Sequence, residues 1–558
     1  MSKPLRPWGR PSAARQPGSV HPLLLASLAI ALLAGVPIIG VLSNLLLVTD
    51  PAASGATAET FSHLWATVLP EYVGNSLAIA AIVALFAAIG GIGCAWLVAV
   101  FDFPGKRMFE WALVLPLAMP AYVVAYAYTD FLQFSGPVQS ALRAWFGWRA
   151  HDYWFPEIRS VGGAGVLFAL VLYPYVYLLA RNAFLERSPR MWDAARTLGV
   201  GPWTAFFKVS LPLARPAAAA GIALALMETL ADYGAVAYFG VPTLTTGIYK
   251  SWYTFSDRTA AAQLAAVLLV AVTVLMLLEQ KSRGRARYYA VGSRTRSQAA
   301  MPLRGGHAWA AALFCALPVV LGFLLPLAIL LRLLSREESV EFGLRYFGWL
   351  QNSIVLAGVT ALIAIVICVL LAYAARVTKS QLQAVCNRIV SMGYAVPGAV
   401  IAVGILIPLS RLDAWGADNG LRFVLTGSVV ALIYAYLVRF LAVSFQTVQS
   451  GLVKITPSMD ASARILGYGI GAMLLRVHAP LLWRSVLTAG LLVFVDVVKE
   501  LPATLTVRPF NFDTLAVITH QLASDERLGE AALPALTIVM IAFVPVVVLA
   551  RAIAKGDK

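Results

Sequence analysis

The stretch Ser188-Pro-Arg-Met-Trp-Asp-Ala-Ala-Arg-Thr-Leu-Gly199 lies between two long apolar runs and returns 268 residues later as Thr456-Pro-Ser-Met-Asp-Ala-Ser-Ala-Arg-Ile-Leu-Gly467. Serine or threonine is a good helix N-cap, proline suits the first helical position, and glycine suits the residue after a helix. Each copy therefore predicts a short helix of about ten residues outside the membrane. The alternative interpretation is a plain surface connector between two spans.

The runs on either side of these copies are too apolar for a soluble protein. The chain has 558 residues, of which 60% are hydrophobic and only 13% are charged, whereas a soluble domain carries about 25% charged residues. A membrane-spanning helix needs about 20 mostly apolar residues, and the first run is too long for a signal peptide. We therefore predict an all-α membrane protein with twelve spans, near residues 22–48, 76–100, 111–129, 160–180, 212–236, 259–278, 308–331, 353–375, 389–410, 423–438, 479–500 and 531–550.

The basic residues indicate which way these spans run. With the N-terminus in the cytoplasm, the cytoplasmic segments hold 30 Lys and Arg when Arg215 and Arg484, near the cytoplasmic ends of two spans, are counted with them; the external segments hold 12, and Lys499 falls inside a span. Basic residues gather on the cytoplasmic side of membrane proteins, so we expect both termini in the cytoplasm. The net charge of +16 then reflects topology, and no nucleic-acid partner is expected. The four cysteines lie in or beside apolar runs without metal-ligand spacing.

The chain reads as two parallel six-span repeats. Asn75-Ser76 matches Asn352-Ser353 at an offset of 277 residues, and Pro120 matches Pro397 at the same offset. After the third span of each half the offset becomes 268, because loop lengths vary easily outside the membrane. We predict a first half over residues 1–280, a basic cytoplasmic linker over 281–306 and a second half over 307–558, with a pathway between the halves.

The repeated stretch, extended to the proline that follows it, resembles the EAA loop of ABC importer permeases. In that family the loop forms a coupling helix that docks on an ATPase subunit. The second copy departs from the pattern, because Ala461 replaces the acid, Ser462 the first alanine and Ala479 the leucine. The resemblance implies ATPase-coupling roles for loops near 188–212 and 456–480, carried by Asp193, Ala194, Ala195, Gly199, Leu211, Pro212, Asp460, Ala463, Gly467 and Pro480.

This resemblance also implies the partners and the fold. The type I ABC importer permease fold works with two copies of a cytoplasmic ATPase subunit, which use ATP and Mg²⁺, in the bacterial inner membrane among lipids. The chain has no Gly-x-x-x-x-Gly-Lys phosphate loop, so we expect no ATPase site and no cofactor in the chain itself.

Charged residues inside spans are functional candidates because burying them in lipid is costly. Glu228 and Asp232 are four residues apart, and the 268-residue offset matches them to Asp496 and Glu500, with Lys499 added. Residues four apart share a helix face, so each half is expected to present an acidic pair in the outer part of the membrane. Solvated helix ends, or a lysine that neutralises one acid, are the structural alternatives.

The sequence around these acids resembles ferric-iron permeases. The resemblance rests on Met227-Glu-Thr-Leu-Ala-Asp-Tyr-Gly234 and Lys499-Glu-Leu-Pro-Ala-Thr504, and it extends along nearly the whole chain. It implies a periplasmic binding protein that delivers ferric iron, with no firm metal site but transient contacts to the four acids. We predict a pathway lined by Glu228, Asp232, Tyr233, Asp496, Lys499, Glu500, Pro120 and Pro397.

Other solutes and another transport mechanism stay open at this point. Fused permeases for thiamine, phosphonate or polyamines share the same layout. An ion-coupled secondary transporter is also commonly built from two six-span halves, and it would use the acids to couple protons or sodium ions. Two capped helices after the fourth spans favour the ABC permease.

Overall fold

The computed structural model describes residues 22–46, 51–185, 201–283, 301–337, 343–378, 380–421, 423–453 and 455–556, and these are almost entirely helical. Among them, 11 helices are long and apolar enough to cross a membrane, or up to 12 if one pair bent by 90° counts as a single span. The described β-structure is one parallel bridge between β1 (Phe101–Asp102) and β2 (Met301–Pro302). The all-α membrane architecture predicted from the sequence is confirmed.

The described elements of the first half run from the N-terminal helix to α13. In chain order they are α1 (Pro22–Leu46), α2 (Pro51–Thr67), α3 (Leu69–Val100), β1, α4 (Lys106–Ala112), η1 (Leu115–Ala118), α5 (Ala121–Leu132), α6 (Pro137–Phe146), α7 (Val161–Leu185), α9 (Pro202–Ala205), η2 (Phe206–Ser210), α10 (Leu211–Ala231), α11 (Gly234–Tyr238), α12 (Leu244–Tyr249), η3 (Lys250–Thr254) and α13 (Arg258–Arg283).

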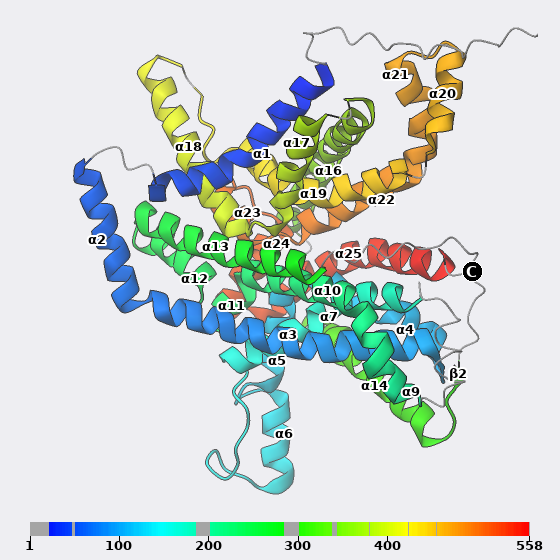
Figure 1. Ribbon diagram of the computed structural model, residues 1–558. Helices are drawn as coiled ribbons and strands as arrows, with labels where there is room; N and C mark the ends of the chain where they lie inside the picture. The colour runs from blue at the N-terminus through cyan, green and yellow to red at the C-terminus, as the bar shows by residue number, and fades with distance from the viewer. Residues whose placement is uncertain are drawn as a thin grey trace, which may run out of the picture.

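The second half repeats this order with similar lengths. After β2 come α14 (Gly306–Val319), η4 (Val320–Leu324), α15 (Leu325–Arg336), α16 (Leu344–Thr378), α17 (Gln381–Met392), η5 (Gly393–Ala395), α18 (Gly398–Asp418), α19 (Val429–Val453), α20 (Pro457–Ile465), α21 (Ile470–Met473), η6 (Leu474–His478), α22 (Ala479–Val498), α23 (Pro502–Val507), α24 (Leu515–Ser524) and α25 (Leu528–Gly556). Figure 1 shows α9, α20 and the C-terminal end of α25 toward the right of the view, and α2 and α12 toward the left.

The third span of each half breaks at the matched proline. Pro120 is the N-cap of α5 and follows the η1 turn, while Pro397 is the N-cap of α18 and follows the η5 turn. Proline disfavours a helical conformation in the residue before it, so the helix stops and restarts. The span predicted over 389–410 therefore begins at Gly398, and the one predicted over 111–129 is the bent pair.

The fifth spans also break, and they do so at the predicted acids. The helix α10 ends at Ala231 and α22 ends at Val498, and each is followed by two short helices, α11 and α12 or α23 and α24. Asp232 already has an extended backbone, with φ −71° and ψ 140°. Spans predicted to continue to residues 236 and 500 are therefore shorter, and the chain turns back within the protein.

The Asn-Ser pairs that marked the repeat hold these returning helices. In the first half the Asn75 amide donates to the Pro242 carbonyl oxygen at 2.9 Å, and the Ser76 hydroxyl accepts from the Leu244 N–H at 3.2 Å. The second half makes the same two bonds, with Asn352 donating to Asp513 O at 3.0 Å and Ser353 accepting from Leu515 N at 2.8 Å. The second span thus satisfies backbone groups at the start of α12 and of α24.

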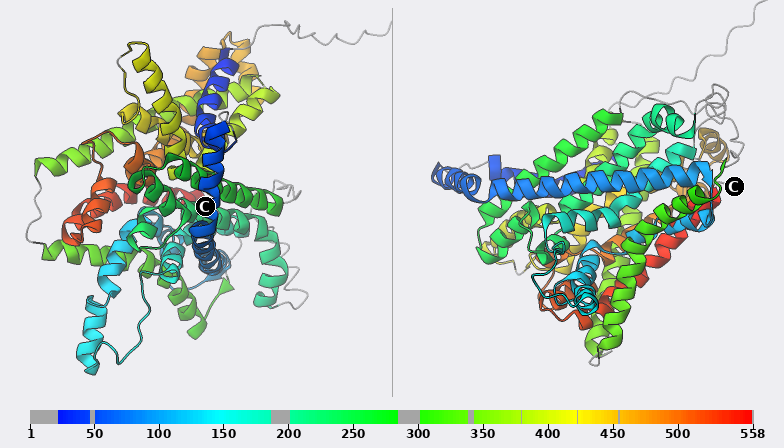
Figure 2. Two further views of the ribbon diagram at one scale, coloured as in Figure 1. Left: turned by 90° about the vertical axis from the view of Figure 1, so that its left-hand side faces the viewer. Right: turned by 90° about the horizontal axis from the view of Figure 1, so that it is seen from below.

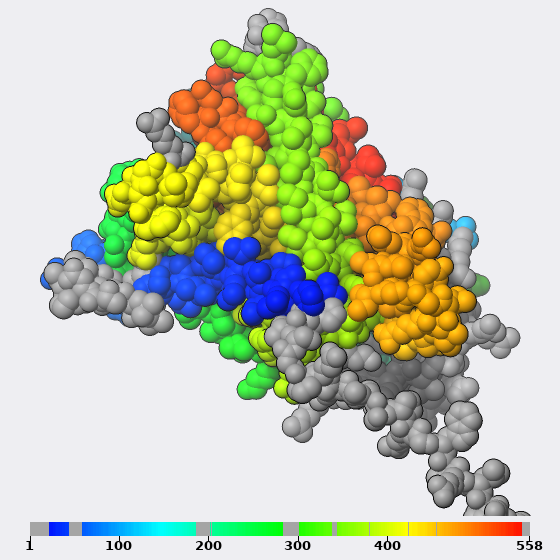
Figure 3. Space-filling view, turned by 90° about the horizontal axis from the view of Figure 1, so that it is seen from above, coloured from blue at the N-terminus to red at the C-terminus, as the bar shows by residue number. Residues whose placement is uncertain are grey.

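The first span of each half packs against the other half. The helix α1 contacts α16, α17 and α18, and the space-filling view shows it lying across these helices (Figure 3). A Cβ on Gly40 would overlap the Gly404 carbonyl oxygen, so α1 and α18 meet at close backbone range. In the same way, the segment from α14 to α15 contacts α3, α4, α5 and α7. Figure 2 shows the same bundle from two further directions. The two halves are therefore interlocked.

Candidate functional site

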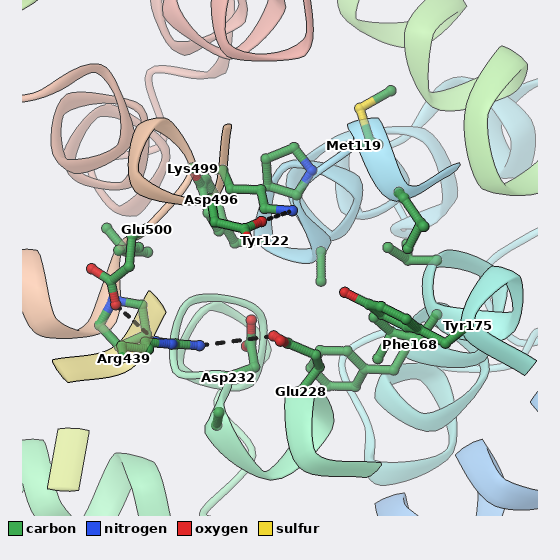
Figure 4. Close-up of a pocket in the computed structure, with 18 of the residues that line it drawn as sticks. Met119, Tyr122, Phe168, Tyr175, Glu228, Asp232, Arg439, Asp496, Lys499 and Glu500 are labelled. Atoms are coloured by element: carbon green, nitrogen blue, oxygen red, sulfur yellow. Dashed lines mark hydrogen bonds and ion pairs between the residues drawn. The ribbon is translucent and has the colours of Figure 1, made fainter. Parts of the chain in front are cut away.

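A cavity of about 110 Å³ lies between the two halves at the breaks of the fifth spans. Figure 4 shows charged side chains from α10, α19 and α22 converging on it, together with the aromatic side chains of Tyr122, Phe168 and Tyr175. Six of the predicted pathway residues line it, namely Pro120, Glu228, Asp232, Asp496, Lys499 and Glu500. The two remaining predictions, Tyr233 and Pro397, do not line it.

Glu500 is the most deeply buried acid of the cavity. It is 4% exposed and accepts hydrogen bonds from the backbone N–H groups of Ala503 at 2.9 Å and Thr504 at 3.0 Å. The Thr504 hydroxyl donates to the same carboxylate at 2.7 Å. These N–H groups belong to the first turn of α23, where a carboxylate is favoured by the helix dipole. Glu500 therefore caps the helix that follows the break.

Arg439 lies in the middle of α19 and connects two of the acids. Its Nη1 is 2.9 Å from Glu500 Oε1, and its Nη2 is 3.8 Å from Glu228 Oε2 (Figure 4). The Tyr394 hydroxyl donates to Glu228 Oε1 at 2.6 Å. Two groups in this cluster, Arg439 Nε and the Tyr122 hydroxyl, are buried without a hydrogen-bond partner among the described residues.

The other two predicted acids have partners of their own. Asp496 Oδ1 is 2.9 Å from Lys499 Nζ, one turn along the same chain. Asp232 accepts the Ala235 N–H at 2.9 Å and so caps α11, in the position that Glu500 occupies before α23. The alternative that Lys499 neutralises one of the acids therefore agrees with its observed contact to Asp496.

The prediction that the two acids of each pair share one helix face is wrong. Glu228 and Asp496 lie on helices, whereas Asp232 and Glu500 lie beyond the helix ends and face the next helix. The four acids line a cavity between the halves. Across the part of the chain that the structure describes, no three His, Cys, Asp or Glu side chains are arranged to hold a metal ion.

Tyr233 and Pro397 lie beside the cavity. The Tyr233 ring stacks on Tyr249 with 3.8 Å between centroids and meets His520 edge-on at 5.8 Å. His520 Nδ1 is in turn 2.6 Å from the Tyr126 hydroxyl. These rings come from both halves, so they form an aromatic contact between them. After Pro397, a Cβ on Gly398 would overlap Arg439, which requires a glycine there.

Sequence reasoning missed Arg439 and Tyr394. The predicted span 423–438 ended one residue before Arg439, so this arginine was counted as a cytoplasmic charge. The helix α19 runs from Val429 to Val453 and buries Arg439 to 8% exposure. The usable signal was a single arginine in an apolar stretch, which is costly in a membrane unless it is paired.

The first cytoplasmic loop is described only in its final part. Asp193, Ala194, Ala195 and Gly199 lie outside the described residues. Leu211 and Pro212 begin α10, directly after the π-helical turn η2. Proline has no N–H to complete the α-helical ladder, and the Leu211 N–H instead reaches back five residues to Phe206 O. Pro480 stands in the same relation to η6, where Ala479 N–H bonds Leu474 O.

The second loop contains the predicted short helix. The helix α20 spans Pro457–Ile465 with Thr456 as N-cap, and Gly467 follows with φ +81°, a conformation that favours glycine. Ala463, to which the resemblance gave an ATPase-coupling role, is buried at 4% exposure against Tyr373 and Met473. The outer surface instead carries Met459, Ile465 and Leu466, which are 42%, 85% and 75% exposed.

Asp460 ties this helix to the rest of the chain. Its Oδ2 is 2.7 Å from Arg376 Nε, and its Oδ1 is 2.8 Å from His478 Nε2. Arg376 also donates to the carbonyl oxygens of Leu452 at 3.0 Å and Ile455 at 2.9 Å. Burial acts to raise the pKa of Asp460, but the bonds from Arg376 and His478 outweigh it and hold the pKa below its usual value. The carboxylate is therefore ionised at neutral pH.

Comparison with known proteins gives the family. Residues 90–282 match the model of the binding-protein-dependent transport system inner membrane component. The chain is 25% identical to a Fe(3+)-transport system permease protein of Haemophilus influenzae over 489 residues, covering 87% of this chain and 90% of the relative. It is 30% identical to the molybdenum transport system permease protein of Escherichia coli over 222 residues, covering 39% of this chain and 92% of the relative.

A sulfate transport system permease protein of Escherichia coli is 27% identical over 201 residues, covering 35% of this chain and 69% of the relative. The molybdenum and sulfate relatives thus match a stretch about the size of one half, whereas the ferric relative matches both halves. With its multi-pass helical fold and its duplicated cytoplasmic loop, the chain belongs to the inner membrane components of binding-protein-dependent transport systems, the permeases of ABC importers.

Proposed function

We propose that this permease moves ferric iron, received from a periplasmic binding protein, along a route between its two halves. The observation that carries the proposal is the extent of the match to the ferric permease relative, which takes in 87% of the chain and therefore both halves. The cavity supports it, because four carboxylates and the two phenols of Tyr122 and Tyr175 line it, and oxygen ligands suit hard cations.

The route passes the breaks of the fifth spans. Glu228, Asp232, Asp496 and Glu500 offer transient contacts to the cargo, while Lys499 and Arg439 balance their charge. Pro120 and Pro397 place the breaks in the third spans that let these groups face the route. Broken helices near the membrane midplane are a common way to build transport sites.

Two copies of a cytoplasmic ATPase drive the movement by docking on the two loops. The apolar surface of Met459, Ile465 and Leu466 supports docking at α20, since exposed apolar patches mark protein contacts. Asp193, Ala194, Ala195 and Gly199 serve the first loop, and Leu211, Pro212, Gly467 and Pro480 carry the movement into the spans. ATP and Mg²⁺ act in the ATPase subunits. Both termini lie in the cytoplasm, and the right-hand side of Figure 1, with α9, α20 and the C-terminal end of α25, faces it.

The test is uptake by the complete transporter in lipid vesicles. The chain is reconstituted with its ATPase subunits and binding protein, and radioactive ferric iron, molybdate and sulfate are offered in turn. We expect ATP-dependent accumulation of iron alone. Accumulation of iron driven by an ion gradient, by the chain without the ATPase, would show a secondary transporter instead.

Oxyanion transport is the second candidate, because the molybdenum and sulfate relatives match 39% and 35% of the chain at 30% and 27% identity. Arg439 and Lys499 supply positive charge to the cavity. Each already neutralises a carboxylate of its own half, and the remaining acids make the cavity unfavourable for a free anion. Molybdate or sulfate uptake in the same vesicles would decide for this candidate.

A further inference from the structure

Glu228 differs from the other acids of the cavity in the origin of its partners. Asp496 is paired with Lys499, and Glu500 with Arg439 and the start of α23, all within the second half. Asp232 caps α11 within the first half. Both described partners of the Glu228 carboxylate, the Tyr394 hydroxyl at 2.6 Å and Arg439 Nη2 at 3.8 Å, come across the interface from the second half.

The repeat shows that this contact has no symmetric copy. The position matched to Tyr394 at the 277-residue offset is Leu117, and the position matched to Arg439 at the 268-residue offset is Val171. Both line the same cavity, on the side where Asp496 stands as the counterpart of Glu228. An aliphatic side chain offers no charge or hydrogen bond, so Asp496 takes its partner from its own half. The cross-half contact is one-sided.

Arg439 is held in place whether or not Glu228 is present. Its short bond of 2.9 Å is to Glu500, which is fixed by two backbone N–H groups and the Thr504 hydroxyl. The longer distance of 3.8 Å to Glu228 is the weaker contact. If the halves separate, Arg439 and Lys499 keep their own carboxylates, and Glu228 alone loses its partners.

We propose that Tyr394 and Arg439 form a latch on Glu228 that holds the two halves together, and that release of this latch presents the Glu228 carboxylate to a multivalent cation in the route. In the closed arrangement Arg439 compensates the charge of Glu228. The route therefore gains an uncompensated negative charge only when it opens. The Glu228 side chain is 26% exposed, and a partly buried carboxylate without a partner is unfavourable, so opening is disfavoured until a cation replaces Arg439. This mechanism rests on the proposed transport of ferric iron.

The latch is tested by ATP hydrolysis of the complete transporter in vesicles without its binding protein. Tyr394→Phe removes one hydroxyl and leaves the Glu228 carboxylate. We expect basal ATP hydrolysis to rise about tenfold, which is the low end of the change in equilibrium expected from losing one hydrogen bond to a charged group. The matched control is Tyr434→Phe, since the Tyr434 hydroxyl also bonds across the halves at 2.6 Å, to Leu33 O on α1, and neither residue lines the cavity. This variant should stay within about twofold of the wild type. Equal hydrolysis by both variants would overturn the latch.

The role of the carboxylate is tested by iron uptake with the binding protein present. Tyr394→Phe keeps the charge of Glu228 and should keep uptake. Glu228→Gln should reduce uptake to at least about tenfold below that of Tyr394→Phe, because the cavity loses a negative charge that concentrates the cation. Equal uptake by the two variants overturns the role of Glu228 toward the cation. If wild-type vesicles take up an oxyanion instead, the proposed substrate is wrong, and the hydrolysis experiment still decides the latch. Thermal unfolding of each variant shows that it is folded.

Discussion

The two halves hold the base of their cytoplasmic loops in different ways. In the first half the Trp96 ring of α3 packs on Phe206 at 4.6 Å and on Trp203 at 5.0 Å between centroids. In the second half Tyr373 stands at the position of Trp96, and its hydroxyl donates to Ile470 O at 2.7 Å. Beside it, Arg376, Asp460 and His478 form a partly buried group of polar contacts that ties α20 to α16 and η6.

The residues at matched positions of the two halves show that one kind of contact has been replaced by another. Arg376 corresponds to Ala99 and His478 to Ser210, so neither matched position in the first half carries a charged side chain. Both halves nevertheless keep the π-helical turn before the matched proline. The backbone geometry is thus shared, while the side chains that fix it have diverged from apolar packing to directional polar bonds. This extends the divergence already visible between the two copies of the loop.

The largest effect is expected from breaking the aromatic contact. Trp96→Ala removes a side chain that is 2% exposed and packed on three rings, and the cavity left behind should lower the free energy of unfolding by about 3–5 kcal/mol. The measurement is denaturant unfolding of the purified chain in detergent. Trp145→Ala is the control, because Trp145 on α6 is 80% exposed and should change stability by less than about 0.5 kcal/mol. Similar losses in both variants would mean that the aromatic contact does not hold the first half.

Breaking the polar contact in the second half should cost somewhat less. Arg376→Gln leaves Asp460 with His478 alone and removes two bonds to backbone carbonyl groups. We expect a loss of about 3 kcal/mol, at the low end for a broken buried ion pair because both side chains are 16% exposed. Arg464→Gln on the exposed surface of α20 is the control and should be nearly neutral. If Arg376→Gln is also neutral, α20 is held by its apolar packing and the contrast between the halves is wrong.

The sequence was sufficient for the features that depend on local chemistry. Apolar runs predicted the spans, and the Thr456-Pro457 and Gly467 pattern predicted α20. These features follow from backbone preferences that act within a few residues. The duplicated loop and the residues around the fifth-span acids also indicated the correct family.

The features that the sequence did not predict depend on contacts between distant segments. Glu228 meets Tyr394 and Arg439, which are 166 and 211 positions away along the chain, and one sequence holds no direct sign of that pairing. Asp232 and Glu500 were placed on helices because their spacing fits a helix, although the chain breaks there to let them cap the next helix. Ala463 was assigned a role in ATPase coupling, whereas in α20 this small residue packs against Tyr373 and Met473 of its own chain.

The smallest expected effect concerns a contact that has not diverged. Asn75→Ala and Asn352→Ala each remove one amide that bonds a backbone carbonyl group before a returning helix, at 2.9 Å and 3.0 Å. Each should lower the free energy of unfolding by about 1 kcal/mol, the usual contribution of such a bond. The two sites lie in different halves without shared partners, so the double variant should show the sum of the two losses to within about 0.5 kcal/mol.

These two asparagines test the limits of the comparison between the halves. If divergence is confined to the cytoplasmic loops and the latch, the two single variants should give equal losses in the same unfolding experiment. Ser62→Ala is a suitable control, since the Ser62 hydroxyl bonds only within α2, to Glu59 O, on an exposed surface. The two losses of unfolding free energy could instead differ by more than about 1 kcal/mol, the contribution of one such hydrogen bond. That result would show that the returning helices have diverged as well. The asymmetry would then extend through the membrane, and the one-sided latch on Glu228 would be one part of a general difference between the halves.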